Sequence, residues 1–96
     1  MNIADYLPEG KENAVSGRHL CALLHIDART LRFIVERARR DMIPICASVD
    51  RKEGGYYLAA NKKEMERFCK RLENQEESIR QTREACEQTI DTLPDD

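Results

Sequence analysis

The 96-residue sequence contains no tryptophan, and aromatic residues make up only 5% of it. Glycine and proline are also scarce, with four and three residues respectively. Aliphatic residues therefore supply most of the hydrophobic content, and such a composition predicts a helix-rich domain with few strands. Hydrophobic runs are short as well. None approaches the roughly 20 residues of a membrane-spanning helix, which argues against a membrane partner.

The four cysteines, Cys21, Cys46, Cys69 and Cys86, form no CxxC pair, and neither histidine stands at a zinc-ligand spacing from them. This pattern argues against a metal site, and nothing else in the sequence indicates a cofactor. Because each cysteine has mainly apolar or helical neighbours, we expect small buried side chains rather than disulfides. No signal peptide is recognisable, so we predict a cytoplasmic protein with reduced thiols.

The net charge of −2 conceals an uneven distribution. Residues 1–15 carry one Lys against three acids, a sum of −2, and residues 61–96 carry seven Lys/Arg against ten acids, a sum of −3. Between them, residues 16–60 carry eight Lys/Arg against five acids, a sum of +3. A basic centre between acidic ends suits an anionic partner at the centre, although the excess is modest.

Two consecutive helices are predicted in the basic centre. Ser16 is a suitable N-cap for a helix over residues 17–25. After a turn of about three residues, Asp27 can cap a longer helix, so that the second element spans residues 27–41. The apolar stripe of this second helix consists of Leu31, Ile34, Val35 and Ala38. Two short helices joined by such a turn are a helix-turn-helix candidate.

A β-hairpin is predicted next. Residues 43–50 alternate in polarity, which indicates a strand with Ile43 and Ile45 on its buried face and Cys46 on the other. In the returning strand, residues 55–59, we expect Tyr56 and Leu58 to face the core and Tyr57 to face solvent. The polar loop between the strands contains Arg51, Lys52, Gly54 and Gly55, and its glycines can adopt positive φ.

A long helix is predicted from the N-cap Asn61, with Glu64 completing a capping box, to about residue 91. The chain thus divides into a domain at residues 1–60 and a C-terminal helix with a frayed acidic tail at residues 61–96. Three apolar residues are expected to fold back and complete the core: Met65, Phe68 and Leu72. The later heptad positions form either a partly solvated face or a homodimer seam made of Leu72, Gln75, Ile79, Thr82 and Cys86.

The predicted order is a short opening helix, a strand near residues 14–16, two helices with a tight turn, and a hairpin with a basic tip. It resembles a winged helix-turn-helix domain. VSGRHLCALLHIDARTLRFIVERARRDMIPICASV, followed by GGYYL, is similar to the biotin-repressor-like class from first strand to wing. The opening DYLPEGKENAVS and the GYY motif resemble small winged-helix proteins of bacterial prophages more closely. No adenylate-binding loop follows, so the resemblance does not extend to biotin chemistry.

The resemblance implies a fold class that is mostly α with a small β-hairpin (α+β), a winged helix-turn-helix followed by a long C-terminal helix. It also implies that helix 27–41 enters the major groove of DNA while the wing, residues 49–57, follows the backbone. The residues near base edges would be Arg29, Thr30, Arg32 and Phe33. The residues near the DNA backbone would be Ser16, Arg18, His19, Arg37, Arg51 and Lys52.

Simpler interpretations stay open for several of these residues. Arg29, Arg32 and Arg37 would also suit a merely solvated helix face, and Phe33 would suit packing beneath the wing or the N-terminal segment. Arg39 and Arg40 are better placed to pair with nearby acids or with the helix C-terminus than with DNA. The histidines lack any catalytic or metal-binding pattern, which favours surface or capping roles.

The sequence therefore favours a bacterial or prophage DNA-binding protein whose partner is double-stranded DNA. Its role would be that of a transcriptional regulator or of an accessory factor in replication or excision. The alternative is a protein-interaction adaptor that uses the winged-helix surface or the C-terminal heptad helix. An enzyme is not expected, because no nucleophile and base, paired acids or phosphate loop appears at usable spacing. No small-molecule effector can be inferred in a chain hardly larger than the DNA-binding unit.

Overall fold

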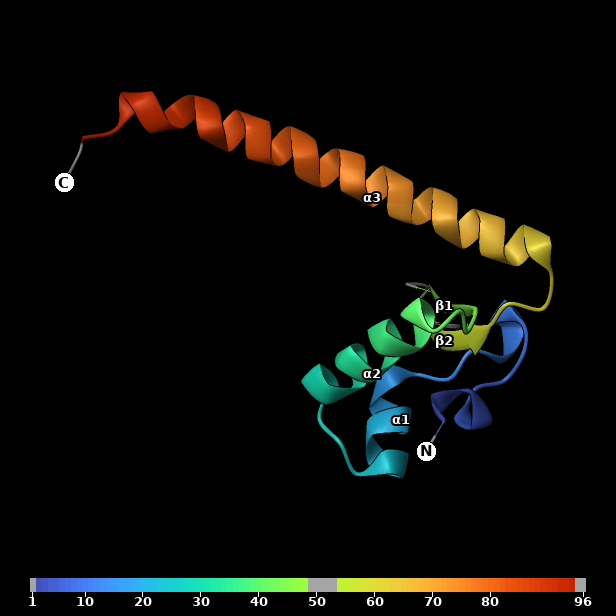
Figure 1. The fold of residues 1–96 in the computed structure, drawn as a ribbon. Helices are drawn as coiled ribbons and strands as arrows, with labels where there is room; N and C mark the ends of the chain where they lie inside the picture. The colour runs from blue at the N-terminus through green and yellow to red at the C-terminus, as the bar shows by residue number, and fades with distance from the viewer. Residues whose placement is uncertain (1, 49–53, 95–96) are drawn as a thin grey trace. The chain divides into compact units, whose positions relative to one another are not determined.

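The computed structural model describes residues 2–48 and 54–94, and its elements follow the predicted order (Figure 1). The first elements are two 3₁₀ helices, η1 (Ile3–Tyr6) and η2 (Lys11–Asn13), and two α-helices, α1 (Gly17–Leu24) and α2 (Ala28–Arg40). They are followed by the strands β1 (Ile45–Ser48) and β2 (Gly55–Leu58), the helix α3 (Lys62–Thr89) and a 3₁₀ turn, η3 (Ile90–Thr92). The fold is mostly helical with a two-stranded antiparallel hairpin, which confirms the predicted α+β class.

The chain divides into two units, Met1–Glu66 and Arg67–Asp96. The first contains the two short helices, the hairpin and the opening turn of α3, and the second contains the rest of α3. The boundary expected from the sequence, between residues 60 and 61, lies at the cap of α3. The structural boundary lies inside the helix.

The starts of α1 and α2 are fixed by the side chains predicted to cap them. Ser16 Oγ accepts the His19 N–H at 3.0 Å, and Asp27 Oδ1 accepts the Thr30 N–H at 2.7 Å. Each bond satisfies one of the N–H groups that have no partner within the helix. Local sequence therefore decides where both helices begin.

Asp27 makes the start of α2 sensitive to acid. Hydrogen bonds from the Thr30 side chain and from the Thr30 backbone N–H lower the pKa of the Asp27 carboxyl below its ordinary value of 3.8. A folded-state pKa below the unfolded one stabilises the fold above about pH 3.8, and this stabilisation is lost as the pH falls through the folded-state pKa. The neutral amide of Asp27→Asn keeps a capping oxygen without this titration.

We therefore expect the difference in stability between the wild type and Asp27→Asn to be constant from about pH 6 to about pH 5 and to shrink below about pH 4. Urea unfolding followed by tyrosine emission at each pH would measure it. A difference that stays constant into strong acid would contradict the capping role of the Asp27 carboxylate.

Between the two helices the chain turns at His25. This residue adopts the left-handed conformation, with φ 55° and ψ 47°, and its N–H donates to the Cys21 carbonyl. The Ile26 N–H also donates to the Cys21 carbonyl, at 3.1 Å. His25 is therefore the C-cap of α1, which confirms a capping role for this histidine and sets a turn of three residues before α2.

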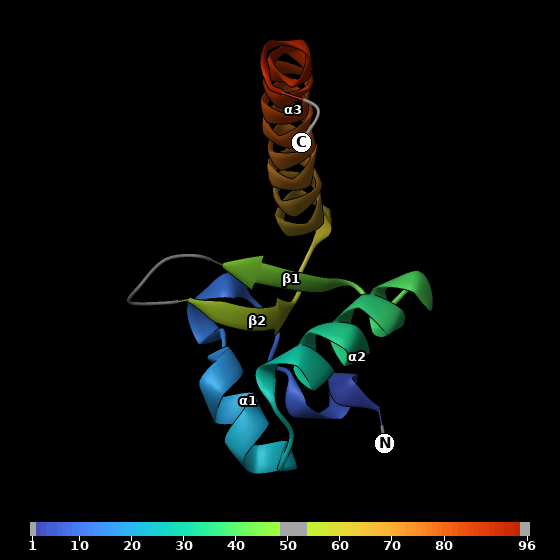
Figure 2. The same cartoon turned by 90° about the vertical axis from the view of Figure 1, so that its left-hand side faces the viewer.

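The hairpin has a partner on both edges of β2. On one edge β1 runs antiparallel to it, with Ile45 opposite Leu58. On the other edge Val15 forms an antiparallel bridge with Tyr56, through hydrogen bonds of 2.9 and 2.8 Å between their backbones. The strand expected near residues 14–16 is thus reduced to one bridged residue. Figure 2 shows the hairpin above α1 and α2, with β2 on the side of α1.

One hydrophobic core holds the first unit together. Leu20 of α1, Val35 of α2 and Ile45 of β1 are each at most 1% exposed. The other members of this buried cluster are Ile3, Leu7, Leu31 and Ala38. Because α2 contributes its whole apolar stripe to this core, its opposite side must face solvent.

The faces of the hairpin differ from the prediction. Cys46 is 0% exposed, which confirms the burial expected of a free cysteine but contradicts its predicted place on the solvent face of the strand, and Tyr57, also expected on that face, is 6% exposed. Their face is covered by the start of α3, where the Cys46 thiol lies 3.7 Å from the sulfur of Met65. The sequence showed a strand with one buried face, and the helix that follows it buries the second.

Burial along α3 agrees only partly with the prediction. Phe68 is buried, as predicted, but Leu72 is 42% exposed and the prediction that it belongs to the core is wrong. Cys69 and Cys86 are exposed, which contradicts their expected burial. Cys86 lies in the stretch from residue 72 to residue 90, in which every described side chain is exposed, and Cys69 is exposed although the neighbouring Phe68 is buried. Helical neighbours in α3 therefore do not bring burial.

Candidate nucleic-acid interface

The solvent-facing side of α2 is basic. The buried stripe of the helix holds it against the core, with Leu31 and Val35 at 2% and 1% exposure. The opposite side carries the exposed residues Arg29, Arg32, Phe33, Glu36, Arg37 and Arg40. At α-helical spacing these side chains share one face, so a rigid helix presents several guanidinium groups together.

Phe33 lies in the middle of this basic face. It follows Arg29 by four residues and precedes Arg37 by four, so the three side chains line up along the helix. Its side chain is 66% exposed. It borders a hollow of about 320 Å³ against the N-terminal segment, lined by Asn2, Ile3, Phe33, Ile34, Arg37, Ala38, Asp41 and Ile43. Phe33 therefore touches this segment's edge but keeps most of its surface open to a partner.

Ion pairs and hydrogen bonds within the protein divide the arginines of α1 and α2 into two groups. Arg40 lies 3.8 Å from Glu36, and the Arg39 Nε–H donates to the Ile45 carbonyl at 2.9 Å, so both have structural partners. By contrast, Arg18, Arg29, Arg32 and Arg37 form no ion pair with any residue in the ranges 2–48 and 54–94. On α1 and α2, these four arginines are therefore available to an external anion.

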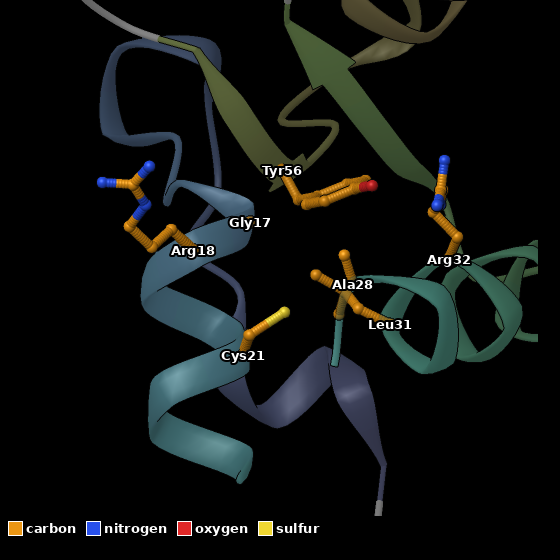
Figure 3. A pocket seen from close by; sticks show the side chains of 7 residues that line it. All are labelled: Gly17, Arg18, Cys21, Ala28, Leu31, Arg32 and Tyr56. Carbon is orange, nitrogen blue, oxygen red and sulfur yellow. The ribbon is translucent and has the colours of Figure 1, made fainter. Parts of the chain in front are cut away.

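A second hollow, of about 530 Å³, lies where the N-terminal ends of α1 and α2 meet β2. It is lined by Gly17, Arg18, Cys21, Ala28, Leu31, Arg32 and Tyr56. In Figure 3, Arg18 and Arg32 stand on opposite sides of this hollow, with the Tyr56 ring between them. The hollow thus has apolar walls with Arg18 and Arg32 at its margins, and in Figure 3 the Arg18 guanidinium extends away from it.

The remaining predicted residues have varied surroundings. His19 is exposed near the start of α1, and Ser16 uses its hydroxyl for the helix cap. Thr30 is exposed and bonded to Asp27, which orients its side chain toward the cap. Arg51 and Lys52, predicted at the tip of the hairpin, lie outside the described residues.

Sequence reasoning missed the role of Gly17, Cys21 and Tyr56 in the hollow. Tyr56 was expected to serve the core only, yet it is half-buried and also forms one wall. One signal was available, because Gly17 and Cys21 stand four residues apart and so place two small residues on one face of α1. Small residues where helices meet leave space beside them.

Among residues 2–48 and 54–94, no group of three or more His, Cys, Asp or Glu residues is arranged to hold a metal ion. Within the same part of the chain, no helix combines the length and the apolar character that crossing a membrane requires. Neither a family model, nor a curated protein, nor a solved structure matches this chain.

Proposed function

We propose that this chain is a double-stranded DNA-binding protein of the winged helix-turn-helix type, in which α2 enters the major groove. The observation that carries the proposal is a group of four exposed arginines on α1 and α2 that form no ion pair among the described residues: Arg18, Arg29, Arg32 and Arg37. The corresponding role is a cytoplasmic regulator of transcription, or an accessory factor in replication or excision, in a bacterium or prophage.

The chemistry of α2 suits base recognition. An α-helix fits the major groove, and arginine can donate two hydrogen bonds to one guanine. Arg29 and Arg32 lie in the first turns of α2, the part of a recognition helix that reaches base edges. Phe33, with 66% of its surface exposed, is positioned to contact a thymine methyl group, and Arg37 lies one turn further, toward the phosphates.

The hollow between α1, α2 and β2 suits one strand of the DNA backbone. Arg18 at its margin would pair with a phosphate, while the half-buried Tyr56 would contact the adjoining sugar. Phosphate contacts of this kind supply most of the affinity and set the register of a protein on the duplex. Base contacts from α2 would then supply sequence preference.

The proposal predicts a steep dependence of binding on salt. If the four arginines neutralise phosphates, the logarithm of the association constant should fall with the logarithm of salt concentration with a slope of about −3 or steeper. Fluorescence anisotropy with labelled duplexes, of random sequence and from the region around the protein's own gene, measures this slope. Absence of binding at the lowest salt concentration would contradict the proposal.

One observation favours a second candidate, a protein-interaction adaptor. Met42, just beyond the C-terminal end of α2, is 88% exposed and has a positive φ of 71°, and Phe33, in the middle of α2, is 66% exposed, so two large apolar side chains of this region face solvent. Exposed apolar residues of this size often mark protein interfaces. The adaptor gains support if duplexes fail to bind while Phe33→Ala removes the binding of a protein partner.

A further inference from the structure

Between residues 73 and 89, α3 separates charged from uncharged residues completely. Its charged residues between positions 73 and 89 are Glu73, Glu76, Glu77, Arg80, Arg83, Glu84 and Glu87. All of them occupy only three of the seven heptad positions, which cover about 120° of the helix surface. Every residue on the remaining face in this range is uncharged.

Both arginines of the charged face pair with glutamates of the same face. Arg80 lies 2.6 Å from Glu77, and Arg83 lies 3.4 Å from Glu87, at helical spacings of three and four. Exposed pairs of this kind stabilise a helix only weakly, but they keep charged groups solvated and compensated. This face therefore has the character of the outer surface of a helical assembly.

The uncharged face exposes large apolar side chains. Ile79 and Leu93 are 69% and 63% exposed, and Leu72 is 42% exposed. Leu72, Ile79, Cys86 and Leu93 are spaced exactly seven residues apart, and polar Gln75, Thr82 and Thr89 each follow one of them by three. A strict seven-residue repeat is the pattern of a left-handed coiled coil, since it keeps one stripe facing a partner helix.

A second copy of the same helix is the partner that this repeat fits. In a parallel, in-register pair, each seam residue packs against the same residue of the second chain. Leu72, Ile79 and Cys86 then form apolar layers, and the two copies of each threonine can share a hydrogen bond. In an antiparallel pair, each apolar layer would face a Gln or Thr layer and bury hydroxyl or amide groups against hydrocarbon, which is costly.

Charge complementarity supports the parallel arrangement as well. In a parallel pair, a residue that flanks the seam on one chain lies opposite the residue five positions later on the other chain. Position 71 of one chain therefore faces position 76 of the partner subunit. These positions hold Arg71 and Glu76, which are opposite in charge. The Arg71 guanidinium lies 5.2 Å from the centre of the Phe68 ring, three residues earlier in the same helix. The two-fold symmetry of the pair makes this contact twice.

We propose that two copies of the chain associate through the uncharged face of α3 as a parallel, in-register helix pair that brings Cys86 beside Cys86 of the partner subunit. Only about three heptads contribute, and the polar layers reduce the buried apolar area, so the dissociation constant is expected to be on the order of 10 µM. The association does not depend on DNA binding and is measured without DNA. A parallel pair would carry both Met1–Glu66 units at the same end, as recognition of two half-sites requires.

Sedimentation equilibrium tests whether the uncharged face of α3 forms the dimer. Ile79→Glu, on the uncharged face, should raise the dissociation constant at least about 30-fold, because it would bury an unpaired charge in the seam. Arg80→Gln, one residue away on the charged face, is the matched control and should leave the constant within about 3-fold. Circular dichroism of both variants checks that α3 still forms. A wild type that remains monomeric at 200 µM, about 20-fold above the expected constant, or a dimer unaffected by Ile79→Glu, would overturn the proposal.

Thiol cross-linking tests orientation and register. In a Cys21→Ser/Cys69→Ser background, Cys86 is the exposed thiol that remains among the four cysteines, because Cys46 is buried. A short bismaleimide should then join two chains efficiently. The control adds Cys86→Ser and Glu84→Cys to this background, which moves the thiol to the charged face and should abolish the cross-link. Dimerisation without a Cys86 cross-link would overturn the parallel, in-register arrangement.

Discussion

Reversal of two charges on α2, Arg29→Glu with Arg32→Glu, is expected to lower the affinity for duplex DNA about 100-fold or more near 0.1 M salt. Both side chains are exposed and have no ion-pair partner among the described residues, so the wild-type charges are free to meet phosphates or guanines. The variant removes two positive charges and adds two negative ones at the centre of the proposed interface. The salt slope should become shallower by about 2, since about 0.9 is lost for each phosphate contact.

A matched control separates this local effect from the change in net charge. Arg80→Glu with Arg83→Glu alters the net charge by the same amount, also at two exposed arginines three residues apart on a helix. It should weaken DNA binding by less than about 5-fold, because charges that do not contact the DNA contribute little once salt screens them. Equal losses in the two variants would show that α2 is not the contact surface, and anisotropy titrations of both distinguish the cases.

Gly55→Ala is expected to destabilise the first unit by about 3 kcal/mol or more. Gly55 has a φ of 138°, a conformation that residues with a Cβ rarely adopt. A Cβ at this position would also lie 2.1 Å from the Val15 carbonyl oxygen and 2.8 Å from the Ser16 nitrogen, both of which are backbone atoms. Relief of this clash would break the bridge between Val15 and Tyr56 and shift the cap of α1.

Urea unfolding followed by tyrosine emission measures the effect on the correct unit. The sequence has no tryptophan, and its three tyrosines, Tyr6, Tyr56 and Tyr57, all precede the second unit. Gly17→Ala is the control, because a Cβ there would meet Leu31 and Tyr56 at 3.6 Å, an ordinary contact distance. It should be neutral or stabilising by up to about 1 kcal/mol. An unchanged midpoint for Gly55→Ala would contradict the close approach of β2 to Val15.

The features that could be read from the sequence are those decided by neighbours within four residues. Ser16, Asp27 and Asn61 cap their helices as predicted, because a capping oxygen reaches only the next turn. The buried stripe of α2 also follows the prediction, as Leu31, Val35 and Ala38 are all buried. The basic outer face of α2 is the complement of that stripe, so the arginines at its centre could be found in advance.

Glu64 makes one hydrogen bond that the local sequence predicts and one that it does not. The capping box was expected to involve only α3, and Glu64 Oε1 does accept the Ala60 N–H at 2.8 Å. Its other oxygen, Oε2, accepts the Lys11 N–H at 3.2 Å, which ties the start of α3 to the N-terminal segment. No spacing within the helix indicates a partner 53 residues away.

By itself, the sequence determined the order and limits of the helices, the hairpin, the apolar stripe and the basic face of α2, since helical and strand periodicity and capping act over one or two turns of chain. Tertiary structure alone decided the burial of Cys46 and Tyr57, the hollow between Arg18 and Arg32, and the need for glycine at position 55. Each of these depends on which distant segment packs against a local element. Packing in the shared core selects that segment. The alternation of residues in a strand is compatible with burial of one face or of both faces, and only the helix that covers the second face decides between them.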